Sequence, residues 1–118
     1  MRPTPLRILA LLIPVAAGCA SYPAPTDRMA SSEAAVRGAR EVGAEGVPQA
    51  SLQLRLAEEN IAKARAAMAE DENELADRLL QRAQADAELA LSLARENKAR
   101  NEAQQVLGQV AQLRGQVK

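Results

Sequence analysis

Two stretches of the chain carry apolar residues at alternating steps of four and three, the heptad spacing of helices that pack along their length. The polar segment "EDENE", residues 70–74, separates the two stretches and predicts a tight turn near residue 72. We therefore expect an antiparallel helical hairpin, with helices at about 49–69 and 74–96. The first seam comprises Ala50, Leu54, Ala57, Ile61, Ala64 and Met68, and the second comprises Ala76, Leu80, Ala83, Ala87, Ala90 and Ala94.

When the two seams are matched outward from the turn, every large side chain on one helix meets an alanine on the other. This complementarity lets two helices approach closely, which favours a hairpin. Tyr22 is the chain's one aromatic residue, so alanine and a few aliphatic side chains must form a thin core. The predicted fold is all-α. The matched pairs are Met68–Ala76, Ala64–Leu80, Ile61–Ala83, Ala57–Ala87, Leu54–Ala90 and Ala50–Ala94.

A further helix is predicted at residues 27–42, with Thr26 as its N-cap and Asp27 near its positive N-terminal end. Glycines and a proline within 43–48 end this helix, and Pro48 suits the start of the next one. With the hairpin, this helix makes a three-helix bundle or a coiled-coil-like structure. Its weak apolar stripe is Met29, Ser32, Ala35, Val36, Ala39 and Val42.

Beyond Ala94 the hairpin seam is lost, and a new seam begins on a face rotated by roughly a third of a turn or more. We expect residues 95–118 to form a helical extension that cannot follow the hairpin packing. The new seam meets the first helix, packs on another chain as in a homo-oligomer, or projects into solvent. Its residues are Ala99, Ala103, Val106, Val110, Leu113 and Val117.

Residues 1–18 have the pattern of a secretory signal peptide. Arg2 and Arg7 give it a positive start, and the apolar run at 8–15 is too short to span a bilayer as a helix. The prolines of residues 19–26 predict an extended tether. Residues 27–118 then form the helical domain, with a hairpin core at 49–94 and the extension at 95–118.

The small residues before Cys19, the chain's single cysteine, resemble the lipobox of bacterial lipoproteins, with Ala16 where leucine is usual. The resemblance implies cleavage between Gly18 and Cys19, and fatty acylation of Cys19 with chains such as palmitate. Ala20, being other than aspartate, favours sorting to the outer membrane by the same resemblance. The alternative is an ordinary signal peptide followed by a chance cysteine.

The sequence argues against an enzyme, because it has no histidine and no phosphate-binding glycine loop. The acidic cluster at residues 70–77 lacks the glycine and the distal glutamate of a calcium loop, so its acids are expected to cap a helix, with Asp71 or Asn73 as N-cap. Balanced charge, 15 basic against 15 acidic side chains, argues against nucleic acid as a partner. We expect no cofactor and no metal.

Several features within residues 49–94 resemble small alanine-rich bacterial lipoproteins that carry domain of unknown function 4398. These are "LAEE" at 56–59, the pair Ala64 and Ala67, the acidic turn at Asp71, and "AQADAELA" at 83–90. That group also occurs beside peptidoglycan-binding domains of the outer-membrane protein A type. The resemblance implies a cell-envelope setting and no known reaction.

The chain also resembles murein lipoproteins in its acyl-cysteine start, its alanine-containing heptads and its last residue, Lys118. In that family the terminal lysine is joined to peptidoglycan, so the resemblance implies a wall contact at Lys118. The glycine-containing tail departs from that family's terminal sequence.

From these features we expect a lipoprotein attached through Cys19 to the inner leaflet of the outer membrane and facing the periplasm. It would act as a structural or protein-interaction module with an unidentified envelope protein as partner. Two alternatives stay open: an oligomeric coiled-coil linker between outer membrane and peptidoglycan, and an accessory regulator of an envelope enzyme.

Overall fold

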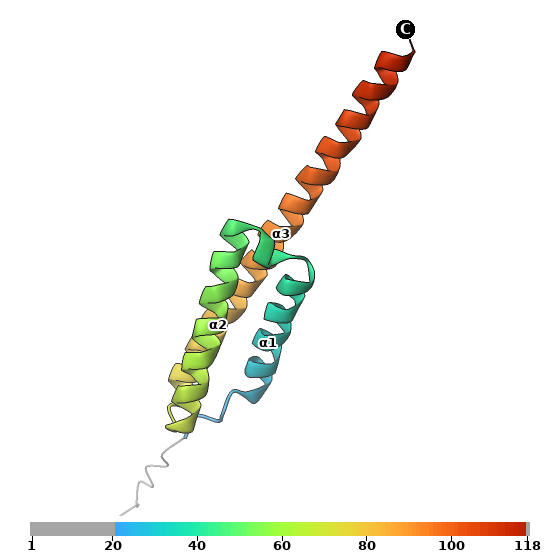
Figure 1. Cartoon of the computed structure of the whole chain (residues 1–118). Coiled ribbons are helices and arrows are strands. Elements are labelled where there is room, and N and C mark those ends of the chain that lie inside the picture. Colours follow the sequence, from blue (N-terminus) through green and yellow to red (C-terminus); the bar gives the residue numbers. More distant parts are fainter. Residues whose placement is uncertain (1–20, 118) are drawn as a thin grey trace, which may run out of the picture.

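The computed structural model describes residues 21–117, which are helical apart from the N-terminal tether and the connections. Three helices follow in the order α1 (Thr26–Glu41), α2 (Pro48–Ala69) and α3 (Asn73–Gln116), with a short 3-10 helix, η1 (Ala44–Gly46), between the first two. α2 runs antiparallel to both of the other helices, and α3 continues far beyond them (Figure 1). The predicted all-α fold, a hairpin with an added N-terminal helix and a C-terminal extension, is confirmed.

The hairpin of α2 and α3 forms the main packing surface of the bundle. Eleven of the twelve predicted seam residues are buried, and Met68, nearest the turn, is partly buried and packs on the same core. Most of the core is alanine, and Leu80 is its largest fully buried side chain. A core this thin works because alanine lets the two helix backbones approach closely.

α1 packs chiefly against α3 and less against α2. Its predicted stripe faces inward: Ser32, Val36 and Ala39 are buried, and the other three positions are partly buried against the core. The Ser32 hydroxyl, fully buried, donates a hydrogen bond of 3.1 Å to the backbone oxygen of Leu80. This satisfied hydroxyl explains how a serine can be fully buried between α1 and α3.

Two ion pairs join the exposed sides of α1 and α2, and each helix supplies the arginine of one pair and the glutamate of the other. Arg40 of α1 binds Glu58 of α2, and Arg65 of α2 binds Glu33 of α1. They span a shallow groove whose apolar floor is Val36 and Ile61. These surface pairs set the alignment of α1 more than they add to stability.

The connection from α1 to α2 follows the glycine and proline pattern. Gly43 has a φ of 88°, in the left-handed region that glycine enters without strain, and the chain then forms η1. Pro48 is the first residue of α2, where its missing N–H costs nothing, as the sequence predicts.

The predicted N-caps are wrong by one residue. Pro25 precedes α1 and its carbonyl accepts the Met29 N–H, so Thr26 is already helical and caps nothing. At the start of α3 the N-cap is Glu72, without a side-chain cap bond. Asp71 lies in the turn with a φ of 59°, and the side-chain amide of Asn73 bonds to the backbone oxygen of Tyr22.

α3 continues as one helix of 44 residues, about 66 Å long, although the helices beside it end near Ala94. Every residue from 95 to 117 is exposed. Of the three alternatives for the extension, contact with α1 does not occur. Within this chain the extension projects into solvent.

Candidate functional site

The predicted lipidation and cleavage positions, Cys19 and Gly18, lie outside the described residues, as does Lys118. The described part of the tether begins at Ser21, two residues after Cys19. Two features of the described chain bear on function. One is the attachment of the tether to the bundle, and the other is the apolar face of the α3 extension.

Tyr22 attaches the tether to the beginning of α3. The side-chain amide of Asn73 donates a 3.0 Å hydrogen bond to the backbone oxygen of Tyr22. The Tyr22 side chain lies beside the carboxylate of Asp77, one turn further along α3. The tether therefore leaves the bundle beside the α2–α3 turn, at the end opposite the extension (Figure 1).

Asp77 is the centre of this attachment. Its carboxylate, nearly buried, pairs with Nε of Arg28 from α1 and accepts a 2.8 Å hydrogen bond from Nε2 of Gln81. The Arg28 guanidinium, with help from Gln81 and Tyr22, holds the pKa of Asp77 below its usual value against the opposing effect of burial. The nearby Asp77 carboxylate in turn raises the pKa of the Tyr22 hydroxyl. One side chain thus joins the tether, α1 and α3.

The sequence pattern did not predict this cluster, and Asp77 was expected among the acids that cap a helix. No spacing rule connects Arg28 with Asp77, because 49 positions separate them and they meet only when α1 lies along α3. The one available signal was the lone aromatic residue of the chain, Tyr22, standing in an otherwise small and proline-rich tether.

The acidic cluster has no metal-binding geometry in the described chain. Within residues 21–117 no group of three or more acidic, cysteine or histidine side chains is arranged to hold a metal ion. Glu70, Asp71 and Glu72 occupy the exposed turn instead, and Glu74 pairs with Arg78 one turn later in α3.

The α3 extension carries an apolar stripe along one face, which we define as Ala99, Ala103, Val106, Val110, Leu113 and Val117. Because α3 is continuous, 100° per residue puts this stripe about 140° around the helix from the face that packs on α2. Val106 is 56% exposed, Leu113 61% and Val117 87%. Leu107 lies beside the stripe and is also exposed.

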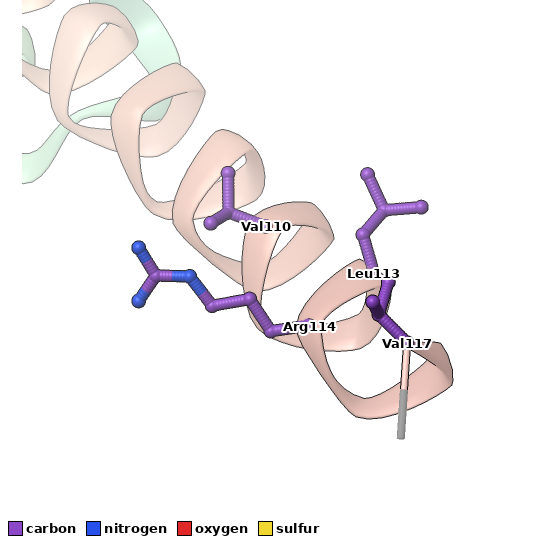
Figure 2. Close-up of a pocket in the computed structure, with 4 residues that line it drawn as sticks. All are labelled: Val110, Leu113, Arg114 and Val117. Carbon is purple, nitrogen blue, oxygen red and sulfur yellow. The ribbon is translucent and has the colours of Figure 1, made fainter.

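Figure 2 shows the last turns of this stripe. Val110, Leu113 and Val117 project from the last turns of α3, and Arg114 extends on the Val110 side, away from Leu113. Together the four residues line a shallow apolar depression. No other helix of the described chain lies against them. A run of uncovered valine and leucine on one helix face is typical of a protein interaction surface.

The extension has local support only near the bundle. Glu96 pairs with Arg100, and the amide of Asn101 binds that of Asn97 at 3.1 Å. From Glu102 to Val117, in the part of the chain that the structure describes, no side-chain hydrogen bond or ion pair supports the helix. Gly108 and Gly115 weaken this segment by about 1 kcal/mol each relative to alanine.

No helix in the described residues is both long and apolar enough to cross a bilayer. A family model described as a domain of unknown function (DUF4398) matches residues 27–106. The chain belongs to this family. The match spans α1, α2 and α3 as far as Val106, well beyond the stretch at 49–94 that carries the resemblance in sequence. No curated protein and no solved structure matched the chain.

Proposed function

We propose that the protein is a lipid-anchored interaction module of the bacterial cell envelope. Acyl chains on Cys19 attach it to the inner leaflet of the outer membrane, and the helical domain faces the periplasm. The bundle serves as a rigid base, and the apolar stripe of the α3 extension binds a protein partner.

The observation that supports this proposal is the placement of the tether at the end of the bundle opposite the extension. Tyr22, held by Asn73 and Asp77, lies only three residues after Cys19, and three residues span about 10 Å at most. A lipid at Cys19 would therefore keep the α2–α3 turn close to the membrane. The extension would point away and present its stripe at a distance of up to about 66 Å.

The strength of such an anchor depends on the number of acyl chains. Each buried methylene contributes about 0.8 kcal/mol, so one chain binds reversibly and two or three bind firmly. Diacylglyceryl attachment to the Cys19 thiol, with acylation of the freed amine, would supply two to three chains. This number is sufficient for stable anchoring.

The test is fractionation of cells that express the full chain with Cys19→Ser. We expect the wild type to sediment with membranes and to incorporate labelled palmitate, and Cys19→Ser to lose the label and the mature size. The matched control combines Cys19→Ser with Ser21→Cys, which keeps one thiol two residues away. Labelling of that control, or wild-type fractionation of mature-sized Cys19→Ser, would contradict lipid anchoring at Cys19.

A second candidate function is a link between the outer membrane and peptidoglycan, and the direction of the extension favours it. An anchor at one end of the molecule and a free helix at the other suit a bridge across part of the periplasm. Sedimentation with purified sacculi tests this function. If Lys118 carries the link, its deletion abolishes covalent attachment, whereas retention after the deletion would exclude Lys118 as the attachment point.

A further inference from the structure

We propose that the partner of the apolar stripe is a second copy of this chain, bound in parallel and in register along the α3 extension. The choice of a parallel arrangement rests partly on the proposed function, because two copies anchored in one membrane point their extensions the same way. The self-association itself rests on the stripe and on the residues around it.

The stripe has the composition of a dimeric coiled-coil seam. Its steps of four and three assign Ala103, Val110 and Val117 to the first core position of the heptad, and Ala99, Val106 and Leu113 to the other. A β-branched residue at the first position and leucine at the second favour two parallel strands. Val110, Leu113 and Val117 have this arrangement in the last turns of the helix, where nothing in the described chain covers them.

The glycines of the extension lie where a dimer tolerates them. Gly108 and Gly115 both fall on the side of the helix opposite the stripe, about 160–180° away at 100° per residue. They weaken the isolated helix and leave the seam intact. The other outward positions beyond Glu102 are mostly glutamines, which make this face soluble without local ion pairs.

The composition of the seam and the shared membrane anchor favour the parallel arrangement, since charge beside the seam does not separate the two arrangements. In parallel, Gln109 lies opposite Arg114 of the other copy, and Arg95 lies opposite Arg100, which is paired with Glu96 of its own chain. In the antiparallel arrangement that aligns the same stripes, Arg100 would face Arg114 of the other copy. Like charges are unfavourable at either position.

The bundle nucleates the extension, but little within the extension stabilises its helix further. The described residues after Glu102 have no side-chain pair to support them, so each turn there depends on helix propensity alone. Burying the stripe against an identical helix supplies the missing stabilisation. Anchoring both copies in one membrane raises their effective concentration, which compensates for the short seam.

The experiment is disulfide crosslinking of the full chain in whole bacterial cells, with a single added cysteine at Leu113→Cys or Val117→Cys. In the parallel arrangement each of these residues faces its own copy, so oxidation should convert most of the protein to a species of twice the mass. Gln112→Cys, next to Leu113 and off the stripe, should give at least several-fold less. Wild type, whose one cysteine is Cys19, reports the background.

Mixed expression separates the two orientations. In the antiparallel arrangement Leu113 faces Ala103 and lies about 15 Å from its own copy, too far for a disulfide. Crosslinking only between Ala103→Cys and Leu113→Cys chains would overturn the parallel register. Adducts with a different protein, or no crosslink at either stripe position, would overturn self-association.

Palmitate labelling in the same cells keeps the two proposals apart. If Leu113→Cys crosslinks without lipid on the protein, lipid anchoring fails and self-association stands. If the protein carries lipid and neither stripe cysteine crosslinks, self-association fails and lipid anchoring stands.

Discussion

Alanine sets the distance between the helices of this protein. Ala57, Ala64 and Ala83 are completely buried in the hairpin, where a longer side chain would have to push two helix backbones apart. The core therefore depends on a series of small side chains along the seam, and each alanine matters more for the close approach of the helices than for the apolar area that it buries. A larger side chain at any one seam position should therefore destabilise the fold.

Replacing Ala83 with leucine tests this dependence. Ala83 is fully buried on the hairpin seam, so Ala83→Leu should lower the free energy of unfolding by about 1–3 kcal/mol. Ala85→Leu, two residues along on the exposed side of α3, is the matched control and should change it by less than about 0.5 kcal/mol. Urea unfolding followed by circular dichroism measures both, and equal effects would contradict close packing at the seam.

Asp77 is the residue whose ionisation should affect stability. The pKa of its carboxyl is lower in the folded chain than the ordinary aspartate value of 3.8. The stability that the ionised Asp77 carboxylate contributes is therefore complete above about pH 4, and it is lost as the pH falls from there through the pKa of Asp77 in the folded chain. Asp77→Asn should be less stable than wild type at pH 7, and the difference should shrink below pH 4.

Unfolding curves at pH 7, 5, 4 and 3 measure this effect. Glu88→Gln is the control, since Glu88 is exposed on the same helix and bonds only to Gln84 in its own element. A difference between Asp77→Asn and wild type that stays constant over this range would show that the Arg28–Asp77 charge pair is not its source.

At the scale of elements, α3 is one helix in two environments. Its first half is fixed by α1 and α2, and its second half has every side chain exposed. The first half acts as a nucleus from which the second half can extend without the cost of starting a new helix. The exposed half should then be the least stable part of the described chain.

Replacing both glycines of the extension should make it more helical. An added Cβ meets nothing within 4 Å at Gly108 or at Gly115, so alanine fits at both positions. Gly108→Ala with Gly115→Ala should stabilise the segment by about 1 kcal/mol per site. Amide hydrogen exchange should slow from residue 103 onward and stay unchanged in α2; no change in the extension would mean that it is already fixed by another contact.

On the scale of the whole molecule, the protein is a bundle with its tether at one end and an exposed apolar stripe at the other. The cluster of Tyr22, Arg28 and Asp77 defines the first end, and Val110, Leu113 and Val117 define the second. The two features thus lie at opposite ends of the long axis of the molecule. In an anchored copy the α2–α3 turn should lie next to the membrane, with the extension pointing away from it.

Fluorescent probes at Glu70→Cys and Gln112→Cys test this orientation on the lipidated protein in vesicles. Both positions are exposed, and they are separated by roughly the length of α3, about 60 Å. Quenchers on the lipid headgroups should strongly quench the Glu70 probe and leave the Gln112 probe nearly unaffected. Equal quenching of the two probes would show that the molecule lies flat on the membrane.

Residue periodicity and the turn residues were enough to predict the helices, their antiparallel pairing and the seam between them. Heptad spacing and the matching of large residues to alanine are local and periodic, so residues such as Leu80 and Ile61 could be placed in the core without coordinates. Glycine and proline chemistry likewise fixed the connection to Pro48. The lipidation of Cys19 remains a prediction from sequence, since it lies outside the described residues.

The position of α1, the place where the tether leaves the bundle and the surroundings of the extension follow from the packing of the helices and not from any local pattern. The pairing of Arg28 with Asp77 and the bond from Ser32 to Leu80 join residues about 50 positions apart, and no periodic pattern encodes such contacts. The seam of the extension was visible in the sequence. Its exposure was not, because exposure depends on where the neighbouring helices end.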